Sequence, residues 1–219
     1  MNLRVPTNES AFGSVELPVT DDAGHLLWFQ DPNNQASDVV AFPFAPDEKV
    51  FDAVGISISL FADEELIKNE KVIEGDALYF VGLMPQYYGD RKNYPLLRKG
   101  SLALLTDEAI DTPSGKQHVY LADMPSWPGN SGSPVLLNLG GQREGGLMAG
   151  FRLYFLGVLL AYYSNMRTGQ TVDTATITGG DPSNIGISLV LPATTLRHVL
   201  DSELAKKQRD SQIPKKQAP

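Results

Sequence analysis

One serine of the chain lies in a stretch whose residue types suit nucleophilic chemistry. The stretch reads DMPSWPGNSGSPVLL over residues 123–137, and Ser131 stands between Gly129 and Gly132. Glycines let the backbone turn sharply and let a substrate carbonyl approach, because they have no Cβ atom. An exposed hydroxyl at such a turn is the first requirement for covalent acyl transfer. An ordinary turn of Gly, Asn and Ser has the same composition, so the pattern alone leaves both interpretations open.

The same turn contains main-chain donors that a nucleophilic serine needs. During acyl transfer the carbonyl oxygen of the substrate becomes an oxyanion, and converging N–H groups stabilise it. The N–H groups of Gly129 and Ser131 flank Asn130 and can point to one spot when the chain turns sharply. The expected oxyanion hole is therefore the segment Gly129, Asn130 and Ser131.

The motif PGNSGSPV, residues 128–135, resembles the nucleophile motif of the trypsin-like (chymotrypsin-fold) serine peptidases. Other segments agree with that family in order and content, and the resemblance extends over most of residues 12–204. These segments are SDVVAF (37–42), GDALYFVGLMP (75–85), LGVLLAY (156–162) and SNIGISLVLPATTLRHVL (183–200). The motif around the serine is fairly specific, whereas SDVVAF carries weight only through its position.

The resemblance implies roles for individual residues. Ser131 corresponds to the nucleophile, Asp38 to the acid of the catalytic triad, and the amides of Gly129 and Ser131 to the oxyanion donors. The alternative for Asp38 is a residue at the start of a strand or in an Asx-turn. The order of the motifs along the chain favours the catalytic interpretation.

The resemblance also implies where a substrate binds. The residue six positions before the nucleophile, Pro125, corresponds to the base of the S1 pocket. No carboxylate is present there to pair with a basic side chain, so a small or apolar P1 residue is expected. The substrate backbone is expected to add as a strand along Ile187, Ser188 and Leu189.

The histidine of the triad has no clear counterpart. In this family the order along the chain is His, Asp, Ser. Only His25 precedes Asp38, and it opens the strand-like run HLLWFQ, where a strand-end histidine beside a hairpin is the simpler interpretation. His118 and His198 follow Asp38, so their order is wrong. Loss of the histidine in subtilisin lowers turnover by on the order of 10⁶.

The sequence therefore leaves more than one function open. The first hypothesis is a trypsin-like serine endopeptidase, expected to be an N-terminally truncated or weakly active copy because of the missing histidine. The second is a catalytically inactive peptidase-like fold that binds a peptide or protein. A capsid-like or lectin-like β-sandwich accounts for the strands but not for the ordered motifs. The expected partner is a peptide or protein in the first two cases.

Short apolar runs separated by turn residues predict an all-β fold. The strand-like runs are 12–19, 25–30, 38–44, 53–61, 76–83, 100–105, 118–123, 133–139, 155–164 and 185–191. Helix signals are fewer: ADEELIKN (62–69) predicts a turn or two, and PATTLRHVLDSELAKKQ (192–208) a longer C-terminal helix with leucines on one face.

Together with the resemblance, these runs predict a two-barrel, trypsin-like fold whose first barrel is incomplete at the N-terminus. The expected domains are a partial N-terminal barrel over residues 1–90 and a C-terminal barrel with its helix over 91–205. The basic segment KKQRDSQIPKKQAP, residues 206–219, is expected to be a disordered tail.

Composition excludes several kinds of site. The 219 residues include no cysteine, which rules out disulfides, thiolate metal ligation and a cysteine nucleophile. A net charge of −8 argues against nucleic acid as the main partner. No spacing typical of a metal site or a phosphate loop occurs, so no metal and no cofactor are expected. No signal-peptide or membrane-spanning run is present in the chain, which is expected to be soluble.

Overall fold

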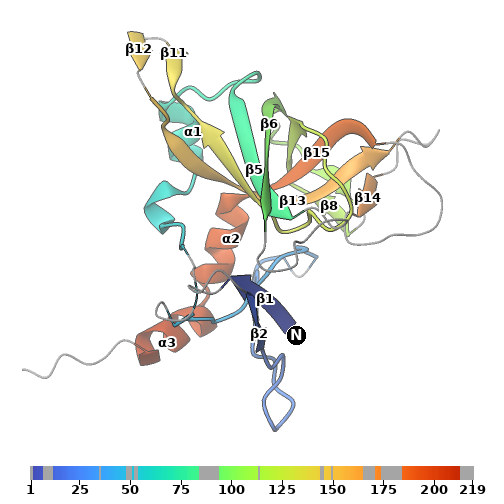
Figure 1. Ribbon diagram of the computed structural model, residues 1–219, viewed down its shortest axis with the longest axis vertical. Coiled ribbons are helices and arrows are strands. Elements are labelled where there is room, and N and C mark those ends of the chain that lie inside the picture. The colour runs from blue at the N-terminus through green and yellow to red at the C-terminus, as the bar shows by residue number, and fades with distance from the viewer. Residues whose placement is uncertain are drawn as a thin grey trace, which may run out of the picture. The chain divides into compact units, whose positions relative to one another are not determined.

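The computed structural model divides the chain into two compact units (Figure 1). The terminal unit contains Met1–Ala53 and Thr195–Pro219, and the barrel unit contains Val54–Thr194. The structure describes residues 2–6, 12–34, 36–47, 51, 54–83, 94–112, 114–143, 146–148, 150–164, 171–173 and 184–212. The domain boundary expected after residue 90 lies outside the described residues, and the strands on its two sides pair with each other.

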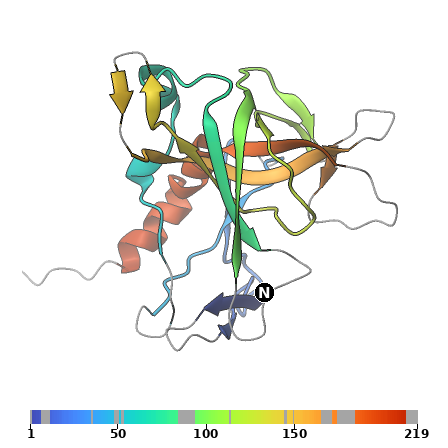
Figure 2. The ribbon, with the colours of Figure 1, turned by 45° about the horizontal axis from the view of Figure 1, so that its top comes forward.

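Six antiparallel strands of the barrel unit close into a ring. They are β5 (Ala77–Leu83), β6 (Pro95–Leu104), β9 (Tyr120–Asp123), β10 (Pro134–Asn138), β13 (Leu153–Ser164) and β15 (Asn184–Pro192). The ring runs β5, β6, β9, β15, β13 and β10, and it closes because β10 pairs with both β13 and β5. In Figure 2, β5 and β6 run across the direction of β13 and β15, as expected for a barrel of this small size. The prediction of a mostly β fold with a closed barrel is confirmed.

Shorter elements surround the barrel. They are β7 (Ile110–Thr112), β8 (Gly115–Gln117), β11 (Gly141–Arg143), β12 (Gly146–Met148), β14 (Thr171–Asp173), the 3₁₀ helix η1 (Ile58–Leu60) and α1 (Glu64–Asn69). The short helix predicted over 62–69 is confirmed as α1. The strand predicted over 53–61 is wrong, since residues 54–60 contain η1 and no strand. The Ser57 hydroxyl accepts a hydrogen bond from the Ser59 amide and so starts the 3₁₀ turn instead.

The core of the barrel follows from the alternation of side chains along its strands. On β10, Val135 and Leu137 are fully buried, whereas the residues beside them are half-buried. On β5, Leu78 and Phe80 are fully buried in the same way. The two strands place these residues opposite one another, Val135 against Phe80 and Leu137 against Leu78. Each such side chain contributes about 1.5–3 kcal/mol when it leaves water.

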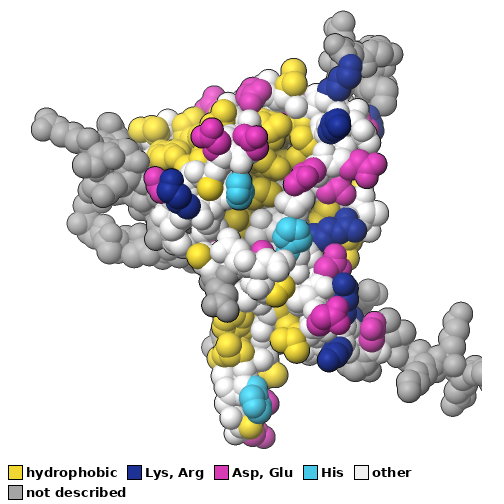
Figure 3. Space-filling model, turned by 180° about the vertical axis from the view of Figure 1, so that it is seen from behind, with side chains coloured by type: hydrophobic (Ala, Val, Ile, Leu, Met, Phe, Trp, Pro, Cys, Tyr) yellow, Lys and Arg dark blue, Asp and Glu magenta, His cyan; other side chains and the backbone are white. Residues whose placement is uncertain are grey.

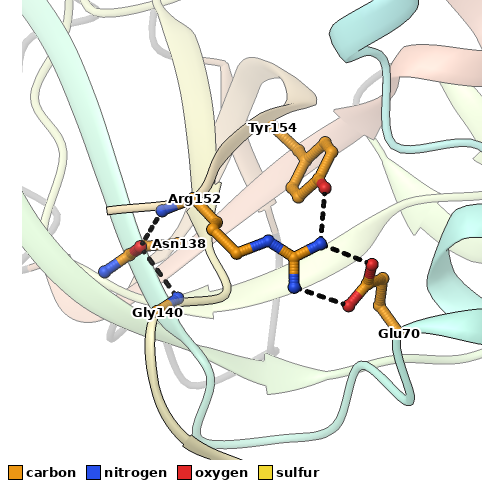
Figure 4. A network of polar contacts seen from close by, with 5 residues as sticks. All are labelled: Glu70, Asn138, Gly140, Arg152 and Tyr154. Atoms are coloured by element: carbon orange, nitrogen blue, oxygen red, sulfur yellow. Dashed lines mark hydrogen bonds and ion pairs between the residues drawn. The ribbon is translucent and has the colours of Figure 1, made fainter. Parts of the chain in front are cut away.

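An ion pair joins Glu70, which follows α1, to Arg152, which directly precedes β13 (Figure 4). The guanidinium of Arg152 donates two hydrogen bonds to the Glu70 carboxylate, at 3.0 and 2.6 Å, and a third to the Tyr154 hydroxyl at 2.9 Å. Bidentate geometry of this kind fixes orientation as well as distance. The Asn138 side chain accepts hydrogen bonds from the amides of Gly140 and Arg152, both at 3.1 Å, and so holds the backbone next to the arginine.

The terminal unit contains short hairpins and two helices. Its elements are β1 (Asn2–Pro6) paired with β2 (Phe12–Glu16), β3 (Phe29–Gln30) paired with β4 (Val40–Ala41), the greater part of α2 (Ala193–Leu200), and α3 (Glu203–Gln212). Among its described residues these pairs form two separate two-stranded sheets, so a first barrel stays a prediction.

The predicted C-terminal helix is present but broken into α2 and α3. The break falls at Ser202, whose hydroxyl accepts a hydrogen bond from the Ala205 amide at 3.3 Å and whose carbonyl accepts one from Lys206. Serine commonly begins helices in this way. Because α3 extends to Gln212, residues 206–212 are helical and not part of a disordered tail. Residues 213–219 of that expected tail lie outside the described residues.

The substitution Gly157→Ala tests whether the close approach of β13 and β15 is needed for a stable barrel. A Cβ atom at this position lies 1.9 Å from the carbonyl oxygen of Leu191, so only glycine fits. We expect Gly157→Ala to lower the free energy of unfolding by about 3 kcal/mol, because the two strands must separate. Gly55→Ala is the control, since a Cβ there meets no atom within 4 Å. Chemical denaturation measures both, and equal stabilities for the two variants contradict this account of the closure.

Candidate functional site

Ser131 lies on the connection between β9 and β10. Gly129 and Gly132, on either side of it, have φ angles of 92° and 80°. These values lie in the left-handed region, which glycine adopts at no steric cost and which other residues avoid. The backbone therefore reverses direction twice within a few residues, with Ser131 between the reversals. The sharp turn predicted from the two glycines is confirmed at the level of the backbone.

The side chain of Asn130 holds this turn closed from the inside. Asn130 is buried, and its carboxamide oxygen accepts a hydrogen bond from the Trp127 amide at 2.9 Å. Its nitrogen donates to the Leu83 carbonyl at the end of β5, also at 2.9 Å. The main chain adds a hydrogen bond from the Asn130 amide to the Trp127 carbonyl. The Asn130 side chain thus points into the protein, and both its carboxamide and its main-chain amide are hydrogen-bonded to the protein.

The C-terminal end of the turn, at Gly132 and Ser133, is hydrogen-bonded to β13. The Gly132 amide donates to the Leu159 carbonyl at 2.8 Å, and the Leu159 amide donates to the Ser133 carbonyl at 3.0 Å. The Ser133 hydroxyl packs so closely on β5 that a Cβ atom at Gly82 would lie 2.6 Å from it. Ser131 is thus carried between two anchored backbone segments.

The Ser131 side chain itself is exposed. Within the described part of the chain, its hydroxyl makes no hydrogen bond, and neither do the amides of Gly129 and Ser131. The amides of Asn130, Gly132 and Ser133 all donate to the protein. The turn therefore leaves one hydroxyl and two nearby amides without a hydrogen-bond partner among the described residues.

A cation–π contact is made by Trp127, in the segment that leads into the turn. The guanidinium carbon of Arg98, on β6, lies 4.2 Å from the centroid of the Trp127 ring. Arg98 also donates a hydrogen bond to the Pro125 carbonyl at 3.3 Å. Stacking of this kind contributes about 0.5–1 kcal/mol at exposed sites. The sequence analysis missed this pair, because Arg98 is far from Trp127 in the chain and nothing in the sequence brings the two together.

The residues expected to bind substrate have mixed outcomes. Pro125 is exposed in the segment that leads to the turn, and its expected place at the base of an S1 pocket stays a prediction. The expectation for β15 needs correction. Ser188 and Leu189 are fully buried, and β15 already pairs with β9 on one side and β13 on the other at these residues. A substrate strand cannot add there, and Ile187, half-buried at the same inner strand, offers no free edge beside β9.

Ser188 instead forms part of a buried polar cluster beneath the turn. Its hydroxyl donates to the Met124 carbonyl at 2.5 Å and lies 2.9 Å from the Ser126 hydroxyl. Ser126 and Met124 are both buried. The cluster satisfies polar groups that are removed from water, so its contribution is to fix the segment that leads into the serine turn.

His25, the candidate base, pairs with a residue of its own hairpin. Its Nδ1 lies 2.9 Å from the Asp21 carboxylate, which also accepts hydrogen bonds from the amides of Ala23 and His25. The bond with His25 is the main cause that lowers the pKa of Asp21. Asp38, the expected triad acid, is exposed in the same terminal unit, and the carboxylate that His25 contacts is not that of Asp38. The Asp21–His25 spacing around Gly24 could have revealed this turn.

The other two histidines have separate surroundings. Nδ1 of His198, on α2, lies 3.9 Å from the carboxylate of Asp31, a side chain that is only 5% exposed. His118 precedes β9 and lines a cavity of the barrel unit. Of the three histidines, His118 is the one that shares the barrel unit with Ser131, and among the described residues it is not hydrogen-bonded to this serine.

Within the residues that the structure describes, no group of three or more His, Asp or Glu side chains is placed to hold a metal ion. No described helix has the length and apolar character needed to cross a bilayer. Comparison with known proteins gives no match, neither to a family model, nor to a curated protein, nor to a solved structure. The geometry of the turn is therefore the main guide to function.

The substitution Asn130→Ala tests whether the carboxamide stabilises the turn. Asn130→Ala leaves the Leu83 carbonyl and the Trp127 amide without their partners, which we expect to lower the free energy of unfolding by about 2–3 kcal/mol. Asn69→Ala, at an exposed asparagine of the same unit, should change it by less than about 0.5 kcal/mol. Urea denaturation measures both variants. If Asn130→Ala is as stable as its control, the carboxamide does not hold the turn.

The substitution His25→Ala tests whether the hydrogen bond between Asp21 and His25 lowers the pKa of Asp21. Since the hydrogen bond with His25 is the first cause of the lowered pKa of Asp21, His25→Ala should raise this pKa towards its ordinary value of 3.8. The ¹³C chemical shift of the carboxyl group, followed against pH, measures it. His118→Ala should leave the Asp21 pKa unchanged. A pKa of Asp21 that stays low without His25 would show that the backbone amides alone lower it.

Proposed function

We propose that this chain is a serine hydrolase of the trypsin-like endopeptidase type, with Ser131 as nucleophile. In this proposal the barrel unit is the second barrel of a two-barrel fold. The observation that carries it is the turn itself: an exposed serine hydroxyl next to two amides that have no partner among the described residues. The resemblance of residues 128–135 to the peptidase motif supports the same assignment.

The proposed reaction is acyl transfer to water. The Ser131 hydroxyl oxygen attacks the peptide carbonyl carbon while a base removes its proton, and the amides of Gly129 and Ser131 stabilise the oxyanion. The C–N bond then breaks, the proton passes to the leaving amine, and water hydrolyses the acyl-enzyme. Asp38 keeps its proposed role as the acid that orients a histidine.

The rate of this reaction depends on the base. The sequence offers no clear counterpart of the family's histidine, and His118, in the same unit as Ser131, is not hydrogen-bonded to it among the described residues. An oxyanion hole and substrate binding alone retain about 10³–10⁴-fold acceleration over water when the triad is removed. We therefore propose weak rather than efficient hydrolysis for the chain as it stands. The same lack of a base favours the second candidate, an inactive fold that binds a peptide at the turn.

Labelling with a fluorophosphonate tests the nucleophile. The reagent should form one phosphonyl adduct on Ser131, detected by mass spectrometry of the intact protein and its peptides, and Ser131→Ala should abolish it. Ser114→Ala is the matched control, since Ser114 is an exposed turn serine of the same unit. Labelling that survives in Ser131→Ala overturns the proposed nucleophile. An absence of labelling in the wild type favours the binding module.

A further inference from the structure

The barrel unit contains a cavity that the proposed hydrolase chemistry does not use. Its volume is about 530 Å³, which lies within the range of small-molecule binding sites. Its walls come from α1, from the connection between β6 and β7, from the start of β9, and from the junction of β15 with α2. None of the described residues that line it belongs to the turn around Ser131.

The wall formed by α1 is anchored on several sides. Asp63 begins the helix by accepting a hydrogen bond from the Leu66 amide at 2.9 Å. The Ala62 amide donates to the Phe155 carbonyl of β13, and Arg152 holds Glu70 at the other end of the helix (Figure 4). The helix is therefore fixed to the barrel at both ends, which places Glu64 and Ile67 beside the cavity.

The opposite wall is held by a hydrogen bond between distant segments. The Leu105 amide donates to the Glu74 carboxylate at 3.0 Å, and this bond is the main cause that lowers the pKa of Glu74. The Thr106 hydroxyl accepts a hydrogen bond from the Glu108 amide, which closes the next turn. Leu105 and Asp107 line the cavity as a result.

The third wall brings two aromatic rings to the same side of the chain. Gln117 and Val119 are buried, so His118 and Tyr120 between and after them project to the opposite face. Burial raises the pKa of the Tyr120 phenol, and the nearby charge of Glu64 raises it further. Tyr120 therefore stays neutral at ordinary pH, and its partly buried side chain lines the cavity.

The charges of the cavity have one sign. Glu64 and Asp107 carry carboxylates, and no lysine or arginine is present among the described lining residues. Figure 3 shows a face on which acidic side chains and a histidine lie next to exposed hydrophobic side chains. A concave site with carboxylates on low-dielectric walls concentrates cations. Apolar Ile67 and Leu105 offer contact to a hydrocarbon body, and the Tyr120 ring is suited to a cation–π contact.

We propose that this cavity binds a small organic cation, in which an ammonium group is carried on an apolar body. The ammonium group lies between Glu64 and Asp107 against Tyr120, and the apolar body contacts Ile67 and Leu105. The proposal is independent of the reactivity of Ser131, since the two sites share no described lining residue.

Titration with 4-phenylbutylamine, followed by ¹H–¹⁵N NMR of the full chain, tests the site. We expect shift changes that map to the amides of the cavity walls, and weaker binding by 4-phenylbutanol and 4-phenylbutanoate. Because Glu64 and Asp107 are exposed, each of Glu64→Gln and Asp107→Asn should weaken amine binding about threefold to fivefold. Raised salt should weaken it in the wild type as well.

Neighbouring carboxylates provide the matched controls. Glu65→Gln and Glu108→Gln change the same net charge next to each cavity residue, but these two residues do not line the cavity. They should leave the affinity within about twofold of the wild type. All four substitutions keep the size of an exposed side chain, and unchanged spectra without amine establish that the variants fold. Equal binding of the amine and the alcohol, unchanged affinity in both cavity variants, or shift changes elsewhere overturns the proposal.

Discussion

The serine turn depends on the buried carboxamide of Asn130. This one side chain spans from the Trp127 amide at the entry of the turn to the Leu83 carbonyl at the end of β5. Both groups are main-chain groups near the protein interior, and each needs a partner when it leaves water. Because the carboxamide satisfies both from inside, the backbone on either side of Asn130 is free to present its amides and the Ser131 hydroxyl outwards. A longer or apolar side chain at this position would lose that arrangement.

The barrel gives this turn its fixed frame. The connection leaves β9 and enters β10, two strands that are not neighbours in the ring, because β15 lies beside β9 and β13 lies beside β10. The chain must therefore cross the end of the barrel, and Gly132 and Ser133 hydrogen-bond to Leu159 of β13 on the way. Beneath the crossing, Ser188 and Ser126 satisfy each other and the Met124 carbonyl. Catalytic groups on loops gain precision when a rigid scaffold holds the loop in this manner.

Local patterns in the sequence predicted the local features well. Gly129 and Gly132 predicted the reversal at Ser131, and the apolar run 133–139 predicted the strand β10. Such local patterns did not predict which distant segments pair with each other. The resemblance implied that a substrate pairs along Ser188 and Leu189, and only the ring order shows that β15 already has a neighbouring strand on each side there. The stack of Arg98 on Trp127 and the cavity between α1 and β9 depend on the same long-range folding.

The central claim is that Ser131 and the two adjacent amides act together on a carbonyl-like group. A crystal structure of the protein with a peptide boronic acid tests it most directly, because a boronate imitates the tetrahedral intermediate. The account predicts a bond from boron to the Ser131 hydroxyl oxygen, with a boronate oxygen about 3 Å from the amide nitrogens of Gly129 and Ser131. Boron bound to another residue, or these amides donating to the protein itself, would contradict it.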